Sequence, residues 1–372
     1  MSIFGRYFRK TKALAKKIKT KSVYFRQDLY DKKTLKNCKK LIVFFIPQKE
    51  EINGGIMSIF SLCKYSRIIN PDAATILCTF PGAATYVKNR LFQNDEKIWR
   101  FDQAVAYANP DEIILHIPEF VSGVIYSWFS EEQKSFLKAP NRKLQINILN
   151  QNILLMPERK FFKDLFLLTK NITQTTAHDS YANQNTCDQF GIPLHHFSVF
   201  IEKKHSPRRT FKQKEKIIVF SPDENCYKEK IEKRIREELK NFKIITVKNL
   251  TFKKYLDLIS RAFCVISFGE GLDGYFCDPL AVESIGISVY NPDFFPSDDF
   301  KNLKNVYSSY EEMAEKLPND IRNLLNNEDE YNLIIEKHKE ILSKLYSFES
   351  FLNNLRKFYK KEYSFFPKES VH

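Results

Sequence analysis

The sequence predicts an α/β protein of two domains, each built on a parallel sheet with helices on both sides. The chain has 372 residues, which is long for one hydrophobic core, so two domains are expected. Apolar runs of strand length alternate with stretches of helical spacing through most of the chain, the pattern of a doubly wound sheet. The alternation stops once, at the polar and basic stretch 202–216, and then starts again. We therefore place the domain boundary near residue 205.

The first domain begins with a buried strand and a glycine loop. The run 40–47 (KLIVFFIP) is apolar and of strand length, and the segment 52–62 becomes helical in spacing after Gly54 and Gly55. A glycine loop between a strand and a helix N-terminus lets a phosphate or another ligand approach the backbone. The loop matches neither GxGxxG nor a P-loop, so the ligand stays open. Four further strands are predicted at 74–79, 112–117, 144–149 and 172–176.

The second domain repeats this order. Strands are predicted at 216–220 and 243–247, and helices at 227–241 and 251–262. A last helical region at 328–360 carries apolar residues at helical intervals, and we expect a pair of helices that packs across both domains. The predicted organisation has four segments: a basic leader at 1–39, a first domain at 40–205, a second domain at 206–327 and C-terminal helices at 328–372.

The segment 263–291 (FCVISFGEGLDGYFCDPLAVESIGISVYN) is the most informative part of the chain. It is expected to form a strand, a glycine-rich loop, a short helix and the next strand. That order predicts that its acids lie at the carboxyl end of a parallel sheet, where open α/β folds bind ligands. The acids are Glu270, Asp273, Asp278 and Glu283. We interpret the segment as the strongest indication of a sugar-nucleotide site.

Positive charge is concentrated at the start of a chain whose formal net charge is +14. Eight Lys and Arg residues fall between Arg6 and Lys21, interleaved with apolar residues near helical spacing. A basic amphipathic helix of this kind suits an anionic membrane surface, and a solvated tail is the alternative. Nucleic acid is not expected as a partner, because no helix-turn-helix, zinc-finger, RNP or OB pattern accompanies the charge.

The remaining composition places the chain among reduced, soluble proteins. No apolar segment reaches the roughly 18 to 20 residues that span a bilayer, and no signal-peptide core is found. The seven cysteines are scattered without a CxxC pair, as expected for reduced cytosolic thiols and not for disulfides or a zinc site. His195 and His196 are adjacent on an extended chain and point to opposite sides, so they are not expected to bind a metal together.

The glycine loop, the acid-rich loop and the two similar domains resemble the GT-B class of glycosyltransferases, in which two Rossmann-like domains face a central cleft. The resemblance covers residues 40–363. In retaining members, the pattern EGFGLPxLEA carries two glutamates, of which the first faces the donor sugar and the second holds the ribose. Glu283 follows Pro279 and Leu280 and matches the second. Glu270 lies thirteen positions before Glu283, whereas the family spacing is eight, so Glu270, Asp273 and Asp278 all stay candidates for the first.

The resemblance also implies a donor site in the second domain. Lys228 or Lys230, after the loop that begins at Ser221, corresponds to the family's phosphate-binding residues, with solvated helix charge as the alternative. Lys248 and Asn249 follow a strand where the family recognises the nucleobase. The expected donor-binding residues are Ser221, Lys228, Lys230, Lys248, Asn249, Asp273, Gly274, Tyr275 and Glu283.

The first domain is expected to bind the acceptor. Asn150, Gln151 and Asn152 end a strand with amides, which bond sugar hydroxyls well, although a turn held by asparagine side chains is the alternative. With Gly54 and Gly55 they form the predicted acceptor site.

A general base is also expected on the first domain. His178 opens a helix after a strand and is the first candidate for the base that deprotonates the acceptor. The alternative is that Asp179, as the helix cap, is the one polar group that matters there. Glu119 is the next candidate.

The predicted function is transfer of a sugar from a nucleotide-sugar donor to a glycan or lipid-linked acceptor, in the synthesis of a bacterial surface polysaccharide such as capsule or lipopolysaccharide. The resemblance implies a metal-independent enzyme without a cofactor, peripheral on the cytoplasmic face of the inner membrane. Two alternatives remain open. One is a GT-B relic that binds a nucleotide sugar or glycan without turnover, and the other is a nucleotide-sugar epimerase on the same fold.

Overall fold

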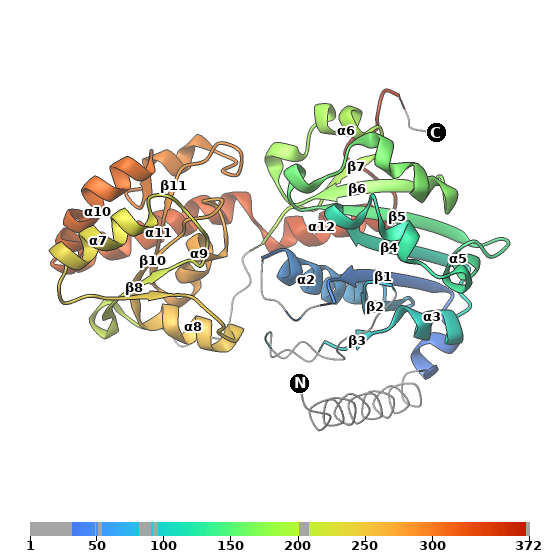
Figure 1. Cartoon of the computed structure of the whole chain (residues 1–372), viewed down its shortest axis with the longest axis horizontal. Helices are drawn as coiled ribbons and strands as arrows, with labels where there is room; N and C mark the ends of the chain where they lie inside the picture. The colour runs from blue at the N-terminus through green and yellow to red at the C-terminus, as the bar shows by residue number, and fades with distance from the viewer. Residues whose placement is uncertain are drawn as a thin grey trace, which may run out of the picture.

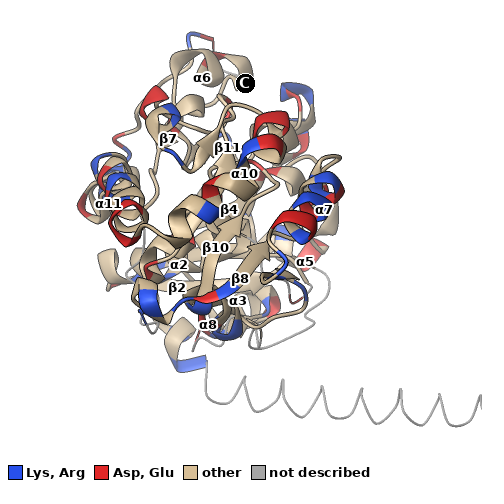
Figure 2. Ribbon diagram, turned by 90° about the vertical axis from the view of Figure 1, so that its left-hand side faces the viewer, with Lys and Arg blue, Asp and Glu red and all other residues tan. Residues whose placement is uncertain are grey.

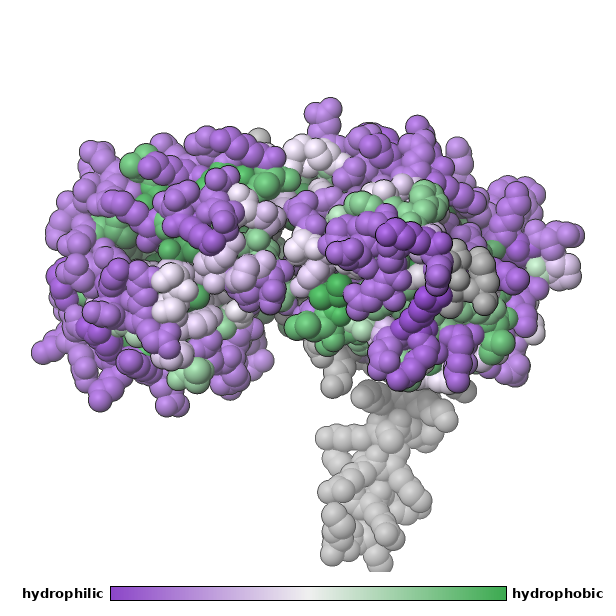
Figure 3. Space-filling model, turned by 90° about the horizontal axis from the view of Figure 1, so that it is seen from above, coloured by the Kyte–Doolittle hydropathy of each residue, from purple (hydrophilic) through white to green (hydrophobic). Residues whose placement is uncertain are grey.

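A computed structural model describes residues 32–48, 50, 54–81, 91, 96–200 and 208–369 of the chain. The predicted basic leader lies outside the described residues except for 32–39. The predicted domain boundary falls in 201–207, which also lies outside them. The described parts form two α/β domains side by side (Figure 1). In the space-filling view the two domains are separate lobes that meet at a narrow waist, and most of the visible surface is hydrophilic (Figure 3).

The first domain is built on a seven-stranded sheet in the order β3-β2-β1-β4-β5-β6-β7, in which all neighbours are parallel. All five predicted strands are present. The two short strands, β3 and β7, were not predicted, because two or three residues carry no periodicity. The strands are β1 (Lys40–Ile46), β2 (Ala74–Thr79), β3 (Ile98–Trp99), β4 (Glu112–Pro118), β5 (Lys143–Asn150), β6 (Ile172–Thr176) and β7 (Leu194–His196).

Strand β1 is apolar on both faces because helices cover both sides of the sheet. Leu41, Val43 and Phe45 point to one side, where they pack with α3 and α5, and the alternate residues point to the other side, where they pack with α2 and α12. The helices are α2 (Gly54–Ile69), α3 (Phe101–Tyr107), α4 (Ile125–Trp128), α5 (Glu131–Leu137) and α6 (Gln184–Phe190).

The second domain has a five-stranded parallel sheet in the order β12-β11-β10-β8-β9. Gly286 in β11 allows close packing, because a Cβ atom there would lie 2.0 Å from the carbonyl oxygen of Phe276. The strands are β8 (Glu215–Phe220), β9 (Lys243–Thr246), β10 (Ala262–Ile266), β11 (Ile285–Val289) and β12 (Val306–Tyr307). The helices are α7 (Lys228–Glu238), α8 (Phe252–Arg261), α9 (Gly274–Cys277) and α10 (Tyr310–Leu325).

Two C-terminal helices connect the domains. Helix α11 (Glu328–Leu345) packs on the second domain, where the Tyr331 hydroxyl donates to the Phe263 carbonyl at 2.6 Å. Helix α12 (Phe348–Tyr359) continues back to the first domain and buries Phe351, Leu355 and Phe358 against its sheet (Figure 1). The expectation that the C-terminal helices cross the domains is therefore confirmed.

We expect Leu355→Ala to lower the free energy of unfolding of the first domain by about 2–5 kcal/mol, because Leu355 is fully buried between α12 and the sheet. The two tryptophans of the chain, Trp99 and Trp128, both lie in this domain, so urea denaturation followed by tryptophan fluorescence reports on it. Leu333→Ala on the exposed side of α11 is the matched control. Equal effects of the two substitutions would contradict the packing described for α12.

Candidate functional site

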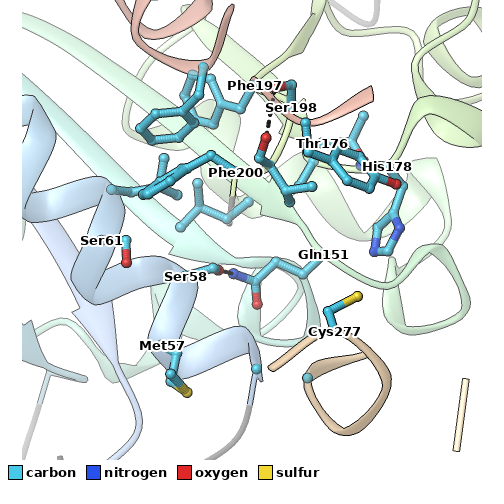
Figure 4. Close-up of a pocket in the computed structure, with 18 of the residues that line it drawn as sticks. Met57, Ser58, Ser61, Gln151, Thr176, His178, Phe197, Ser198, Phe200 and Cys277 are labelled. Carbon is cyan, nitrogen blue, oxygen red and sulfur yellow. Dashed lines mark hydrogen bonds between the residues drawn. The ribbon is translucent and has the colours of Figure 1, made fainter. Parts of the chain in front are cut away.

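A pocket of about 310 Å³ lies between the two domains, at the carboxyl ends of the strands of the first sheet. Its first wall is formed by residues at the ends of β5 and β6 and by the start of α2 (Figure 4). Its second wall is formed by Leu272, Asp273, Gly274, Cys277 and Asp278. Residues 272–278 follow β10 and therefore lie at the carboxyl edge of the second sheet. The carboxyl edges of both sheets, at which open α/β folds bind ligands, therefore face the same pocket.

The N-terminus of α2 faces this pocket. Gly54 lines it, and a Cβ atom at Gly54 would meet nothing within 4 Å. The Gln151 side-chain amide donates to the Gly55 carbonyl at 3.0 Å and to the Ser58 hydroxyl, which ties the loop after β5 to the first turn of α2 (Figure 4). Asn150 lines the pocket from the end of β5. No acid occupies the first turn of α2, so its partial positive charge stays available to an anionic group.

Asn152 links the two domains and does not line the pocket. Its side-chain amide lies 3.4 Å from a carboxylate oxygen of Glu270 across the cleft. Its backbone N–H donates to Glu119 Oε1 at 3.2 Å. Of the predicted acceptor residues, Gly54, Asn150 and Gln151 lie on the pocket wall, Gly55 contributes a carbonyl to the same corner, and Asn152 acts as a bridge.

Glu119 lies beneath this loop and not on the pocket wall, so the structure does not support it as a base that contacts the substrate. Its side chain is only 3% exposed, and its second oxygen, Oε2, has no hydrogen-bond partner. Burial raises the pKa of Glu119 to about 7, although backbone hydrogen bonds from the loop oppose the shift. The sequence showed an acid after a strand, but its burial depends on how the next loop folds over it.

His178 lies on the pocket wall as predicted. Its backbone N–H donates to the Thr176 hydroxyl at 3.2 Å, and its ring packs beside Tyr181 and Phe294, the latter from the second domain. Figure 4 shows the imidazole pointing toward the segment that holds Cys277. Burial is the largest cause that lowers the pKa of His178, so the ring is neutral near pH 7 and can accept a proton.

Asp273 has mainly a structural role at the start of α9. One carboxylate oxygen accepts from the backbone N–H groups of Tyr275 at 2.8 Å and Phe276 at 3.0 Å, which is an N-cap. The other accepts from the Ser267 hydroxyl at 2.5 Å. Burial raises the pKa of Asp273 to about 6, and the nearby Asp223 adds to the shift.

Glu270 and Asp278 both follow β10 at this edge of the second sheet. Asp278 lines the pocket, and Glu270 lies at the interdomain contact with Asn152. Burial raises the pKa of Glu270, and Asp223 raises it further. Asp278 lies eight positions after Glu270, which is the spacing of the two acids in the family pattern. This spacing was visible in the sequence, but the Pro-Leu step before Glu283 directed the match to Glu283 instead.

Glu283 does not lie at the site, which corrects the prediction. It precedes β11, whereas Glu270 follows β10, and the strands are parallel, so the two acids lie at opposite edges of the sheet. Glu283 adopts a left-handed conformation (φ 58°) where the chain turns into β11. Its carboxylate pairs with the Lys339 ammonium at 2.7 Å on α11 and with Arg208 at 4.0 Å. The prediction failed because it grouped Glu283 with the loop after β10, although Glu283 stands just before the next strand.

The residues predicted to bind the donor phosphates differ in where they lie relative to the pocket. Lys228 lies at the carboxyl edge of β8, where its ammonium donates to the carbonyls of Ser221 at 2.7 Å and Asp223 at 2.8 Å. The buried Ser221 hydroxyl accepts from the Phe268 N–H at 2.9 Å and so has a structural role. Lys230 is exposed over the Tyr227 ring, away from the pocket residues. Charged residues of both signs alternate along α7 (Figure 2), as in a solvated helix, and three i,i+4 ion pairs there agree with this.

Lys248, Asn249 and Tyr275 flank the donor edge without lining the pocket. Lys248 and Asn249 follow β9 and are exposed, and Asn249 adopts a left-handed turn conformation (φ 53°). The Tyr275 ring stands against Tyr255, and Gly274 lines the pocket.

Within the described ranges, no group of three or more His, Cys, Asp or Glu side chains is arranged to hold a metal ion. None of the helices in those ranges is long and apolar enough to cross a membrane.

The burial of Glu119 predicts a pH dependence of stability. Between its ordinary pKa of 4.5 and its native pKa of about 7, the native state keeps a proton that the unfolded chain has released. The free energy of unfolding therefore falls as pH rises through this window, by an amount on the order of 3 kcal/mol from this group. Glu119→Gln should remove this fall in urea titrations at pH 5 and pH 8, and Glu131→Gln, an exposed control, should keep it. The same fall in Glu119→Gln would assign the effect to another group.

Comparison with known proteins shows a shared fold at low sequence identity. No protein-family model matches the sequence, and no curated protein matches it significantly. A glycosyltransferase from Rickettsia africae is 11% identical, with 87% of this chain and 98% of that chain covered and a TM-score of 0.52. Sucrose-phosphate synthase from Thermosynechococcus elongatus is 8% identical, with 87% and 99% covered and a TM-score of 0.54. The Anabaena protein HepE, solved with UDP, is 10% identical, with 87% and 100% covered and a TM-score of 0.54. The predicted fold class is thereby confirmed: the chain has the two-domain GT-B fold.

Proposed function

We propose that the protein is a glycosyltransferase that moves a sugar from a nucleotide-sugar donor to an acceptor bound in the interdomain pocket. One observation carries the proposal. The carboxyl edges of both parallel sheets meet at a single pocket, with Asp278 on one side, a neutral His178 on the other, and Glu270 at the contact between the domains. This arrangement places acids, a proton acceptor and a helix N-terminus around one space of ligand size.

The donor is proposed to be a UDP-sugar, for which the UDP complex of HepE provides the precedent. The N-terminus of α2 and the Lys228 ammonium would stabilise the diphosphate as negative charge develops on it. Asp278 and Glu270 would bond the ribose and the sugar, the roles that the family assigns to an acid pair at this spacing. In this proposal the protein groups alone stabilise the leaving group, so no metal is required.

The acceptor is proposed to carry an apolar part, as a lipid-linked acceptor does. The pocket wall opposite the acids is formed by Phe197, Val199 and Phe200, which follow β7, and by Tyr346, which lies between α11 and α12. These residues belong to the two stretches that lead from one domain to the other, so a ligand held there would contact both connections. A role in bacterial surface polysaccharide synthesis at the inner face of the membrane is part of the proposal and is supported by the basic leader.

The chemistry follows from these positions. The acceptor hydroxyl oxygen attacks the anomeric carbon, the bond from that carbon to the phosphate oxygen breaks, and the nucleoside diphosphate leaves with the electron pair. The hydroxyl proton passes to the His178 imidazole, which is neutral because burial lowers its pKa. The two domains exclude water from the pocket as they close, so that transfer competes with hydrolysis.

A binding protein without turnover is the second candidate. It is favoured by Lys228, whose ammonium already bonds two backbone carbonyls, and by the separation of Glu283 from the site. The test is incubation of the full chain with UDP-sugars, with and without lipid-linked and soluble acceptors, and detection of UDP. UDP release supports a transferase, whereas binding of a UDP-sugar without release on any acceptor would favour the binding protein. Conversion of the donor to an epimer without an acceptor would instead identify an epimerase.

We expect Asp278→Asn to weaken donor binding by about tenfold to a hundredfold, because a charge-assisted hydrogen bond to the donor contributes about 1.5–3 kcal/mol. Glu283→Gln is the matched control, since Glu283 pairs with Lys339 at the opposite edge of the sheet. Isothermal titration with the UDP-sugar measures both variants. A large loss of affinity in Glu283→Gln together with a normal Asp278→Asn would reverse the assignment made here.

We expect His178→Ala to lower kcat by about 10²–10⁴ with little change in donor affinity, because general-base catalysis contributes this much. His196→Ala serves as the control, because His196 is also near this edge but does not line the pocket. Steady-state kinetics should be accompanied by circular dichroism, so that a folding defect is recognised. A near-normal kcat in His178→Ala would mean that another group takes the proton.

A further inference from the structure

Two loops at the carboxyl edge of the first sheet expose large apolar side chains. Six of the eleven exposed large hydrophobic residues within the described ranges lie in these loops, so their exposure is not scattered. The first loop contains η1 (Glu119–Val121) and α4, and the second contains η2 (Ile153–Leu155) and the start of η3 (Arg159–Leu167). We call this surface the apolar rim; it consists of Phe120, Val124, Trp128, Leu154, Leu155 and Phe161.

The apolar rim is one continuous surface. The rings of Phe120 and Trp128 both lie against Phe80, with centroids at 6.0 and 5.5 Å. A Cβ atom at Gly123 would lie 3.3 Å from the Cβ atom of Phe161, so the first loop touches the start of η3. Elements η1 and η2 also pack against each other. The two loops therefore present their apolar side chains together.

These side chains are not core residues that happen to reach the surface. Helix η3 buries Phe162 and Leu165 completely, so its inner side already supplies the core. Phe161 points outward from the same helix, and Leu154 is 80% exposed. Leaving this much apolar surface in water is unfavourable, which points to a partner that covers it.

Basic residues beside the rim indicate what that partner is. Arg159, Lys160 and Lys163 outnumber Asp164, the one acid of η3. The Lys160 ammonium stands 5.1 Å from the centroid of the Phe161 ring while it pairs with Glu158 at 2.9 Å. Leucine and aromatic side chains next to lysines are the combination that binds an anionic bilayer, where the apolar groups enter the interface and the ammonium groups contact the headgroups. Trp128 at the rim has the amphipathic ring that prefers this depth.

We propose that the apolar rim docks the first domain on an anionic lipid bilayer. The rim lies at the same sheet edge as the candidate pocket, and Asn152, which bonds Glu270 across the cleft, is two residues from Leu154. Docking through the rim brings the mouth of the cleft to the headgroups, where a lipid-linked acceptor is held. This link between rim and acceptor rests on the proposed function, whereas the docking itself does not.

Trp128 makes the proposal directly testable. The chain has two tryptophans, of which Trp99 is only 7% exposed and Trp128, in the rim, is 39% exposed. The full chain is mixed with vesicles of phosphatidylcholine and phosphatidylglycerol that contain brominated phosphatidylcholine. We expect strong quenching of tryptophan emission, weaker quenching with phosphatidylcholine alone, and no quenching in Trp128→Phe. Because the signal comes from the rim, it does not depend on the predicted binding of the leader.

Matched variants test whether the rim, and not another part of the surface, binds the vesicles. Leu154→Ser combined with Leu155→Ser should lower vesicle partitioning by at least about tenfold. Lys160→Glu with Lys163→Glu should weaken binding to the anionic vesicles only. Leu333→Ser, which changes an exposed leucine on α11 of the second domain, should bind like the wild type.

Two results would overturn the proposal. Vesicle binding without quenching of Trp128 would mean that another part of the chain makes the contact. If the chain binds neither vesicle type, the rim is covered by a protein partner and not by a bilayer. UDP-sugar hydrolysis without vesicles is measured in parallel, because its absence would reject the proposed function while the quenching result stands.

Discussion

The return of α12 to the first domain is the constraint on which the arrangement of the molecule depends. The chain enters the second domain once and leaves it through α11, and α12 then buries Phe351, Leu355 and Phe358 on the sheet of the first domain. The two domains are therefore joined by two connections instead of one. Because both connections line the pocket, through Phe200 and Tyr346, any change in the angle between the domains changes the pocket as well.

A buried polar network specifies where α12 docks. The Tyr359 hydroxyl donates to Ser66 at 2.7 Å and lies 3.3 Å from His116 Nε2, and the other ring nitrogen of His116 lies 3.1 Å from the Asn147 amide. Burial lowers the pKa of His116 to about 3, so its ring is neutral. Buried polar groups are costly when they lose a partner, so a shifted α12 would leave the groups of this network unpaired. Apolar contacts hold α12 on the first domain, and these hydrogen bonds fix the position in which it packs.

The two walls of the pocket differ in charge, which suits transfer of a sugar. The second domain contributes Asp273 and Asp278 to its wall, and Glu270 lies at the contact between the domains, where Asp223 raises its pKa. The first domain contributes the N-terminus of α2, with no acid in its first turn, and the neutral His178. Acids favour positive charge on a reacting sugar, and the helix N-terminus favours the departing diphosphate. Each charge that would develop in the proposed reaction thus has a matching wall.

The sequence by itself determined the fold class, the main strands and the edge at which His178 and Glu270 lie, because apolar periodicity and the order of strand, loop and helix are local properties of the chain. Only the tertiary structure decided that Glu283 lies at the far edge, where a left-handed turn leads into β11, and that Asp278 lies in the pocket. It also decided that Glu119 is buried beneath the loop at Asn152. The position of each acid depends on whether it precedes or follows a strand, and its burial depends on which loop covers it. Residue spacing alone does not contain that information, because tertiary packing decides at which residue a loop ends and the next strand begins.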